Sequence, residues 1–273
     1  MTRDLPVLGV ALSLDMLDLH RDWVLESQRD VELQSFCWPN TDVADYPAMI
    51  ARARRLLDGH SGRLGLHGPF MSFKIDCADP AITEVIRQRM LRTLEICAAL
   101  GADQMVIHSP YGMWNEAECA TSPAAEYGHI ERVRYVLAPV IAEAEALGVD
   151  LVIENVEDID PRARVRLAEA LKSTRLRVSL DTGHAQMMHS RCGAPPVDAF
   201  VQAAGARLGH VHLQDIDGFA DRHWHPGEGV VPWHSVFAAL HRLPRMPRLI
   251  LEVDDERGVR RGAEYLAALG LAR

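Results

Sequence analysis

The sequence predicts a single (β/α)8 barrel, or TIM barrel, formed by one domain over residues 1–273. Short apolar runs alternate with longer amphipathic segments, and this alternation is typical of right-handed β-α-β crossovers around a parallel sheet. Eight such units in about 250 residues are enough to close a barrel. No linker, low-complexity tract or change in composition indicates a second domain.

Eight apolar runs are predicted to be strands. They are PVLGVAL (6–12), VELQSF (31–36), RLGL (63–66), DQMVI (103–107), DLVI (150–153), RVSL (177–180), LGHVHL (208–213) and RLILEV (248–253). The helical segments at 80–101 and 130–148 both end on glycine, and the first begins with proline, as helices often do. A doubly wound open sheet is the alternative, but no G-x-G-x-x-G motif follows the first run to support it.

Composition narrows the class of protein. The net charge of −9 and the presence of only two lysines make a nucleic-acid partner unfavourable. The five cysteines are an odd number without short paired spacing, so they indicate neither a disulfide framework nor a thiolate zinc site. The start of the chain lacks a signal-peptide pattern, and no window reaches the roughly 18 apolar residues of a membrane span. We therefore expect a cytoplasmic protein without a membrane segment.

Six of the eight predicted strands end at or near a side chain that can bind a metal. These residues are His67, His108, Glu154, Asp181, His212 and Glu252. The carboxyl ends of all strands in a closed parallel barrel lie at one face, where active sites are built. Each residue taken singly is at least as compatible with a hydrogen-bonded or capping role. Buried carboxylates and imidazoles that face one another need compensation, however, and together the six predict a divalent-metal site.

The motifs around these residues resemble those of the xylose-isomerase-like TIM barrel superfamily. The matching segments are HGPF (67–70), VIHSPYG (106–112), VIENVED (152–158), SLDTGHA (179–185), GHVHLQD (209–215), DRHWHPGEG (221–229) and LILEVD (249–254). They follow in order over nearly the whole chain, and this order makes the resemblance specific. The superfamily contains sugar isomerases and epimerases and also endonuclease IV.

The resemblance implies two alternative metal centres. In the isomerase and epimerase branch, one divalent metal is held by Glu154, Asp181, His212 and Glu252, with His184 facing the substrate. In the endonuclease IV branch, a D-x-H segment supplies two ligands of a trinuclear zinc cluster, and the additional ligand positions here are His67, His108, His184, Asp221 and His223. All of these positions are filled, which favours more than one metal.

The function expected from these features is a metal-dependent isomerase or epimerase of a small sugar or sugar-like hydroxy-carbonyl compound. Glu154 and Glu252 are expected to exchange the α-proton through an enediolate. The alternative is an endonuclease-IV-like phosphoesterase with a multinuclear zinc site, but the short acidic loop at 37–46 offers no lysine or arginine to a phosphate backbone. We expect manganese or zinc, with magnesium, cobalt or iron as further options, and no organic cofactor.

Three further residues are candidates for contact with the substrate. Trp38 and Trp114 follow strand ends, and an aromatic face suits the C–H side of a sugar, although packing at the barrel rim is an equally open interpretation. Arg222 lies between two candidate ligands and suits a substrate hydroxyl or phosphate, or else a solvated ion pair. A homo-oligomer is compatible with the sequence, which shows no interface signature.

Overall fold

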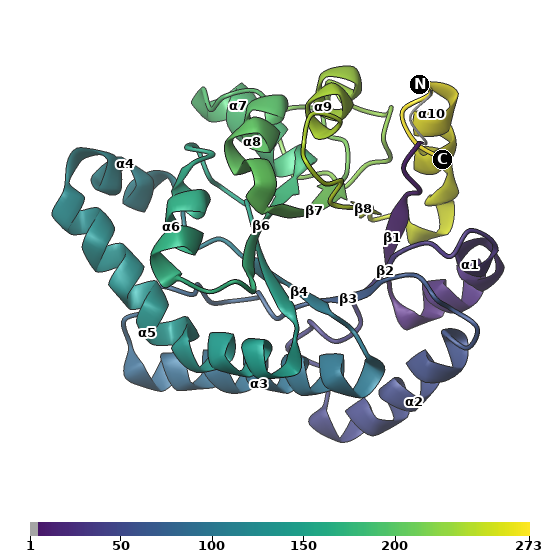
Figure 1. The fold of residues 1–273 in the computed structure, drawn as a ribbon, viewed down its shortest axis with the longest axis horizontal. Helices are drawn as coiled ribbons and strands as arrows, with labels where there is room; N and C mark the ends of the chain where they lie inside the picture. Colours follow the sequence, from purple (N-terminus) through teal and green to yellow (C-terminus); the bar gives the residue numbers. More distant parts are fainter. Residues whose placement is uncertain (1–4) are drawn as a thin grey trace.

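The computed structural model describes residues 5–273 and confirms the predicted closed barrel of eight parallel strands. The strands are β1 (Gly9–Leu12), β2 (Val31–Leu33), β3 (Leu64–His67), β4 (Gln104–His108), β5 (Asp150–Glu154), β6 (Leu176–Asp181), β7 (Leu208–Leu213) and β8 (Arg248–Leu251). Each strand pairs with the next one along the chain, and β8 pairs with β1 to close the ring. Figure 1 shows the strands at the centre and the helices around them.

The helices pack on the outer surface of the strand ring. They are α1 (Leu14–Glu26), α2 (Tyr46–Leu56), α3 (Pro80–Leu100), α4 (Met113–Thr121), α5 (Pro123–Leu147), α6 (Ala163–Leu171), α7 (Thr182–Cys192), α8 (Val197–Ala204), α9 (Trp233–Leu240) and α10 (Arg260–Ala268), with 3-10 turns η1 (Val43–Asp45), η2 (Gly205–Arg207) and η3 (Glu256–Gly258). The predicted glycine stops are confirmed: Gly101 and Gly148 follow α3 and α5 with φ of 74° and 73°, a left-handed conformation that glycine adopts without a steric penalty.

Each predicted strand overlaps one observed strand, and the limits differ by a few residues. The second strand ends at Leu33 rather than at residue 36, because the chain turns there: Cys37 N–H donates to the carbonyl of Gln34, and the Ser35 hydroxyl accepts from the backbone of Leu14. This turn directs the segment after β2 over the end of the barrel. Among the described residues, no helix has the length and apolar character needed to cross a membrane.

Candidate functional site

The predicted strand-end residues meet at one end of the barrel. His67, His108, Glu154 and Asp181 are the last residues of β3 to β6, His212 lies near the end of β7, and Glu252 directly follows β8. Parallel pairing places His108 beside Glu154 and Asp181 beside His212. All of these side chains except His108 are buried, so the barrel holds a compact polar cluster within an apolar core.

A central group of four residues forms the middle of this cluster. One ligand atom from each of Glu154, Asp181, His212 and Glu252 lies within 4.8 Å of the others. The Nδ1 atom of His212 stands 3.1 Å from Glu154 Oε1 and 3.1 Å from Glu252 Oε2. This mixture of imidazole nitrogen and carboxylate oxygen suits zinc or manganese.

Two further groups flank the central one. His67 and His108 gather around Glu154 from one side, and the other group consists of His184, Asp221 and His223. Glu154 belongs both to the central group and to the first flanking group. In the second, His184 Nδ1 stands 3.5 Å from Asp181 Oδ1, so the cluster is continuous. The structure therefore brings together all the residues of both ligand sets that the resemblance implied.

The loop after β7 carries two of these residues into place. Asp215 and Trp224 exchange backbone hydrogen bonds of 2.9 and 3.0 Å, which fold the intervening segment back over the barrel end. Within this segment, the Asp221 carboxylate lies 3.2 Å from His184 Nε2 and 3.2 Å from His223 Nε2. His223 has a positive φ of 44°, so its backbone is held in a conformation that is uncommon for a residue with a Cβ atom.

Backbone carbonyls orient two of the histidines. His67 Nδ1 lies 2.8 Å from the carbonyl oxygen of Gly68, and His184 Nδ1 lies 2.9 Å from that of Asn155. A carbonyl only accepts, so Nδ1 of each ring donates to it, and the Nε2 atom on the other side of the ring faces the cluster, where it could bind a cation. This is the orientation that metal-binding histidines generally show.

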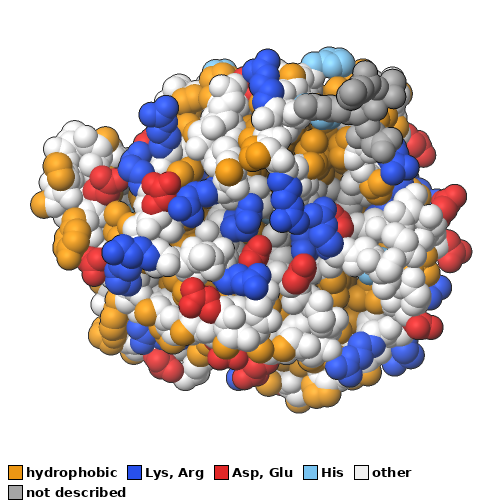
Figure 2. Space-filling model, viewed as in Figure 1, with side chains coloured by type: hydrophobic (Ala, Val, Ile, Leu, Met, Phe, Trp, Pro, Cys, Tyr) orange, Lys and Arg blue, Asp and Glu red, His pale blue; other side chains and the backbone are white. Residues whose placement is uncertain are grey.

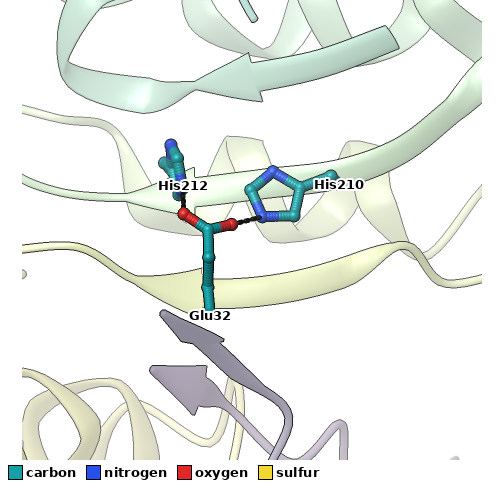
Figure 3. A group of neighbouring side chains, drawn as sticks. All are labelled: Glu32, His210 and His212. Atoms are coloured by element: carbon teal, nitrogen blue, oxygen red, sulfur yellow. Dashed lines mark hydrogen bonds and ion pairs between the residues drawn. The ribbon is translucent and has the colours of Figure 1, made fainter. Parts of the chain in front are cut away.

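Glu32 is a member of the site that sequence reasoning missed. It is buried on β2, where one carboxylate oxygen accepts a hydrogen bond of 3.0 Å from His212 Nε2 and the other lies 3.0 Å from His210 Nε2 (Figure 3). Burial alone would raise the pKa of Glu32, but the two histidines lower that pKa well below its usual range. An acidic residue between the apolar Val31 and Leu33 of the predicted strand was the available signal.

The chemistry of the cluster fits divalent cations. Glu154 Oε2 is buried without a hydrogen-bond partner among the described residues, and the Nε2 atoms of His67 and His108 stand 3.7 and 3.8 Å from it. These separations are too long for hydrogen bonds, but ligands that each lie about 2 Å from one shared ion are spaced in this way. Burial, with the nearby charge of Glu154, raises the pKa values of Asp181 and Glu252. A cation would relieve this repulsion.

The cluster forms the floor of a pocket of about 550 Å³. His184 and Trp38 line this pocket, and Trp38 is 44% exposed. The other two candidates for substrate contact lie elsewhere: Trp114 is 89% exposed on α4, and the Arg222 guanidinium is 2.8 Å from the Asp217 carboxylate, so neither lines the pocket. The alternative interpretation of Arg222 as an ion-paired residue agrees with its position.

Comparison with known proteins gives a family match over most of the chain. The model of the xylose isomerase-like TIM barrel family matches residues 30–269. The chain belongs to this family. A curated relative, the uncharacterised protein MJ1311 of Methanocaldococcus jannaschii, is 22% identical over 206 residues, which span 72% of this chain and 66% of that protein.

Two solved structures illustrate the likeness. The TTHB071 protein of Thermus thermophilus, solved after soaking with ZnCl2, is 26% identical with a TM-score of 0.71, and the match covers 97% of this chain and 99% of that one. The 3-keto-D-glucoside 4-epimerase YcjR of E. coli is 15% identical with a TM-score of 0.72, and the match covers 96% and 99%. The second likeness shows a shared fold.

In this xylose isomerase-like barrel, amide side chains next to the candidate ligands hold Asp181, Asp221 and Glu252 in place. Asn155 Oδ1 accepts from the backbone of Asp181 at 2.8 Å, and Gln214 Nε2 donates to Asp181 and, at 3.0 Å, to Asp221. Gln34 donates to Glu252. Sequence reasoning did not single out these three amides. Asn155 directly follows Glu154 in the chain, and Gln214 comes two residues after His212. This closeness to predicted ligands was the signal that could have identified them.

Proposed function

We propose that this protein is a divalent-metal-dependent isomerase or epimerase that acts on a small sugar or sugar-like hydroxy-carbonyl compound. The observation that carries the proposal is the pair of buried carboxylates, Glu154 and Glu252, which approach His212 from two strands at the floor of a pocket of about 550 Å³. A pocket of this size suits a single small molecule.

Proton transfer is the chemistry that this pair of carboxylates can perform. One carboxylate removes the proton on the carbon next to the substrate carbonyl, and the other returns a proton to an adjacent position or to the opposite face. A divalent cation bound to the central group supplies polarisation of the carbonyl and a neighbouring hydroxyl, which makes that proton more acidic. The hydrogen bond from Gln34 holds the Glu252 carboxylate in place.

The lining of the pocket supports a small substrate. No lysine or arginine is among its lining residues, whereas Glu154, Asp221, Glu252, Asp254 and Glu256 are. On the face that Figure 2 shows, Lys and Arg side chains gather over the middle, with a few Asp and Glu side chains among them. The epimerase among the similar structures has a keto sugar in its name, which agrees with the proposed substrate class.

A phosphoesterase is the second candidate, and the two flanking groups favour it. With the central group, they provide positions for up to three cations, and clustered cations can activate a hydroxide and neutralise phosphate charge. The acidic lining gives no further neutralisation to a nucleic-acid backbone. Cleavage of duplex DNA at an abasic site by the metal-loaded protein, lost on chelation, would establish this second candidate instead.

Exchange of substrate protons with solvent tests the preferred function. We expect the metal-loaded protein to incorporate deuterium from D2O at the carbon next to the carbonyl of at least one ketose in a panel, followed by NMR. Glu154→Gln and Glu252→Gln should each reduce the exchange rate by roughly 10²- to 10⁴-fold, the usual contribution of a general acid or base. The exposed Glu264→Gln variant is the matched control and should not change it. Absence of exchange across all ketoses and aldoses would overturn the proposal.

A further inference from the structure

A second, smaller pocket of about 170 Å³ lies beside the first. Cys37 and Trp38 line both pockets, so these residues form a shared wall. The segment after β3 also borders both pockets, because Pro69 lines the small pocket and Phe70 lines the large one. The ring of Phe70 contacts the ring of Trp38. The two pockets therefore adjoin at Cys37 and Trp38.

Two arginines of α3 give the small pocket its charge. Arg89 and Arg92 both line it and are half-buried, and neither side chain has a hydrogen bond or ion pair with any described residue. Residues three apart on a helix are neighbours, so the two positive charges are close together. No acidic side chain lines this pocket, whereas the large pocket is lined by five acidic residues and by no lysine or arginine.

This arrangement differs from that of other arginines in the same region. Arg87, on the same helix, binds backbone carbonyls of α5, and Arg54 of α2 binds the carbonyl of Ala99. The chain as a whole is acidic, with a net charge of −9. Arg89 and Arg92 nevertheless face a cavity that no carboxylate lines, so they lack the anionic partner that guanidinium groups favour.

We propose that the small pocket binds an anionic group of the substrate, a carboxylate or a phosphate ester. The hydroxy-carbonyl part of the same substrate would lie over the candidate metal cluster. This inference therefore rests on the proposed function and deepens it. Guanidinium groups bind carboxylates and phosphates through paired hydrogen bonds, and the ring of Trp38 offers an apolar face to the carbon chain that joins the two parts. The substrate is then a sugar acid or a sugar phosphate rather than a neutral sugar.

Calorimetric titration of the metal-loaded protein tests this inference. The probes are D-fructose, D-fructose 6-phosphate and D-fructuronate, which separate the neutral, phosphate and carboxylate cases. We expect at least one anionic probe to bind about tenfold or more tightly than D-fructose, since hydrogen bonds between charged groups are about twice as strong as neutral ones. Arg89→Gln and Arg92→Gln should each reduce this preference severalfold without changing the affinity for D-fructose.

Control variants and a second measurement make the result decisive. Arg55→Gln removes an exposed arginine that lies outside both pockets and should leave the preference unchanged, and thermal unfolding verifies that each variant is folded. The inference is overturned if neither anionic probe binds more tightly than D-fructose, or if the preference survives both arginine substitutions. The inference is also overturned if inorganic phosphate binds in an arginine-dependent way but neither anionic sugar binds more tightly than D-fructose, because the pocket is then a separate anion site.

Solvent exchange distinguishes failure of this inference from failure of the proposed function. If the protein exchanges protons of neutral sugars but binds no anionic probe more tightly than D-fructose, the proposed function is supported and this inference is wrong. Arginine-dependent binding of an anionic probe, with no exchange on any sugar, supports an anion subsite and removes the proposed chemistry.

Discussion

His212 occupies the centre of the site because both of its ring nitrogens have carboxylate neighbours. Nε2 is held by Glu32, while Nδ1 faces Glu154 and Glu252. Burial opposes protonation of His212, but these three carboxylates raise its pKa well above the usual range. A buried carboxylate behind a metal-binding histidine fixes the tautomer of the ring and makes its free nitrogen a better ligand.

Substitution of Glu32 tests this role. Glu32→Gln removes the negative charge behind His212 and should weaken binding of zinc or manganese to the central group by about 10- to 100-fold. Competition titration with a chelating dye measures the affinity, and Glu264→Gln is the control for loss of one acidic charge at the surface. Unchanged affinity in Glu32→Gln would mean that the carboxylate serves packing alone.

Glu116 of α4 is a second buried acid, and it lies outside the cluster. Burial, together with the nearby charge of Asp158, raises its pKa to about 7, although the backbone N–H groups of Ile159 and Asp160 donate to it. A carboxyl group whose pKa is raised by folding favours the folded state when it is protonated. The stability that it contributes is present below its unfolded pKa of 4.5 and is lost as the pH rises through about 7.

The pH dependence of stability tests this assignment. We expect the free energy of unfolding of the wild type, relative to that of Glu116→Gln, to fall by about 1–3 kcal/mol between pH 5 and pH 8. Urea unfolding of both proteins at the two pH values, in the same buffer with chelator, measures the difference. A difference that is constant with pH would show that Glu116 titrates normally.

At the scale of elements, the loop after β7 depends on one buried acid. The Asp215 carboxylate accepts from the backbone N–H groups of Gly227 and Val231 at 2.9 Å and from the indole N–H of Trp233 at 3.0 Å. Gly229 approaches Asp215 so closely that a Cβ atom there would lie 2.4 Å from its carboxylate oxygen. The glycines of this segment are therefore required by packing as well as by backbone freedom.

Removal of the Asp215 carboxylate should release the loop and with it Asp221 and His223. We expect Asp215→Ala to lose the cation proposed for the group of His184, Asp221 and His223, and to keep the one proposed for the central group. Its free energy of unfolding should fall by about 2–4 kcal/mol, because buried donors lose their acceptor. Metal content per chain and chemical unfolding measure the two effects. Val230→Ala, in the same loop but 55% exposed, is the matched control and should change neither.

The elements show which parts of the site can be predicted from sequence. Strand ends such as His67 and Glu252 were identifiable, because parallel topology brings all carboxyl ends to one face and the ligand types are few. Glu32 was not singled out: its charge within an apolar run was a signal, but strand periodicity does not show which side chains meet across the barrel interior. The positions of Trp114 and Arg222 depend on how loops and helix ends fold back, and loop length alone does not determine that.

At the scale of the whole molecule, folding and the proposed metal site are expected to be separable. The apolar core lies in the barrel and between the barrel and its helices, whereas the ligands occupy one end. We expect removal of metal with a chelator to abolish activity and leave a cooperative unfolding transition, with a loss of about 4 kcal/mol if the free metal was at a thousand times its dissociation constant. Near-ultraviolet circular dichroism during heating measures this. A chain that unfolds at room temperature on chelation would show that the metal is structural.

The distribution of the central group along the chain has a consequence for biosynthesis. Glu154, Asp181, His212 and Glu252 all come from β5 to β8, whereas Glu32 comes from β2, close to the seam where β8 pairs with β1. Chains fold as they emerge from the ribosome, with the N-terminal part first. A nascent chain that lacks β8 can present histidines and acids but not the complete group, so high-affinity metal capture must wait for closure of the seam. Metal capture would then report completed folding rather than guide it.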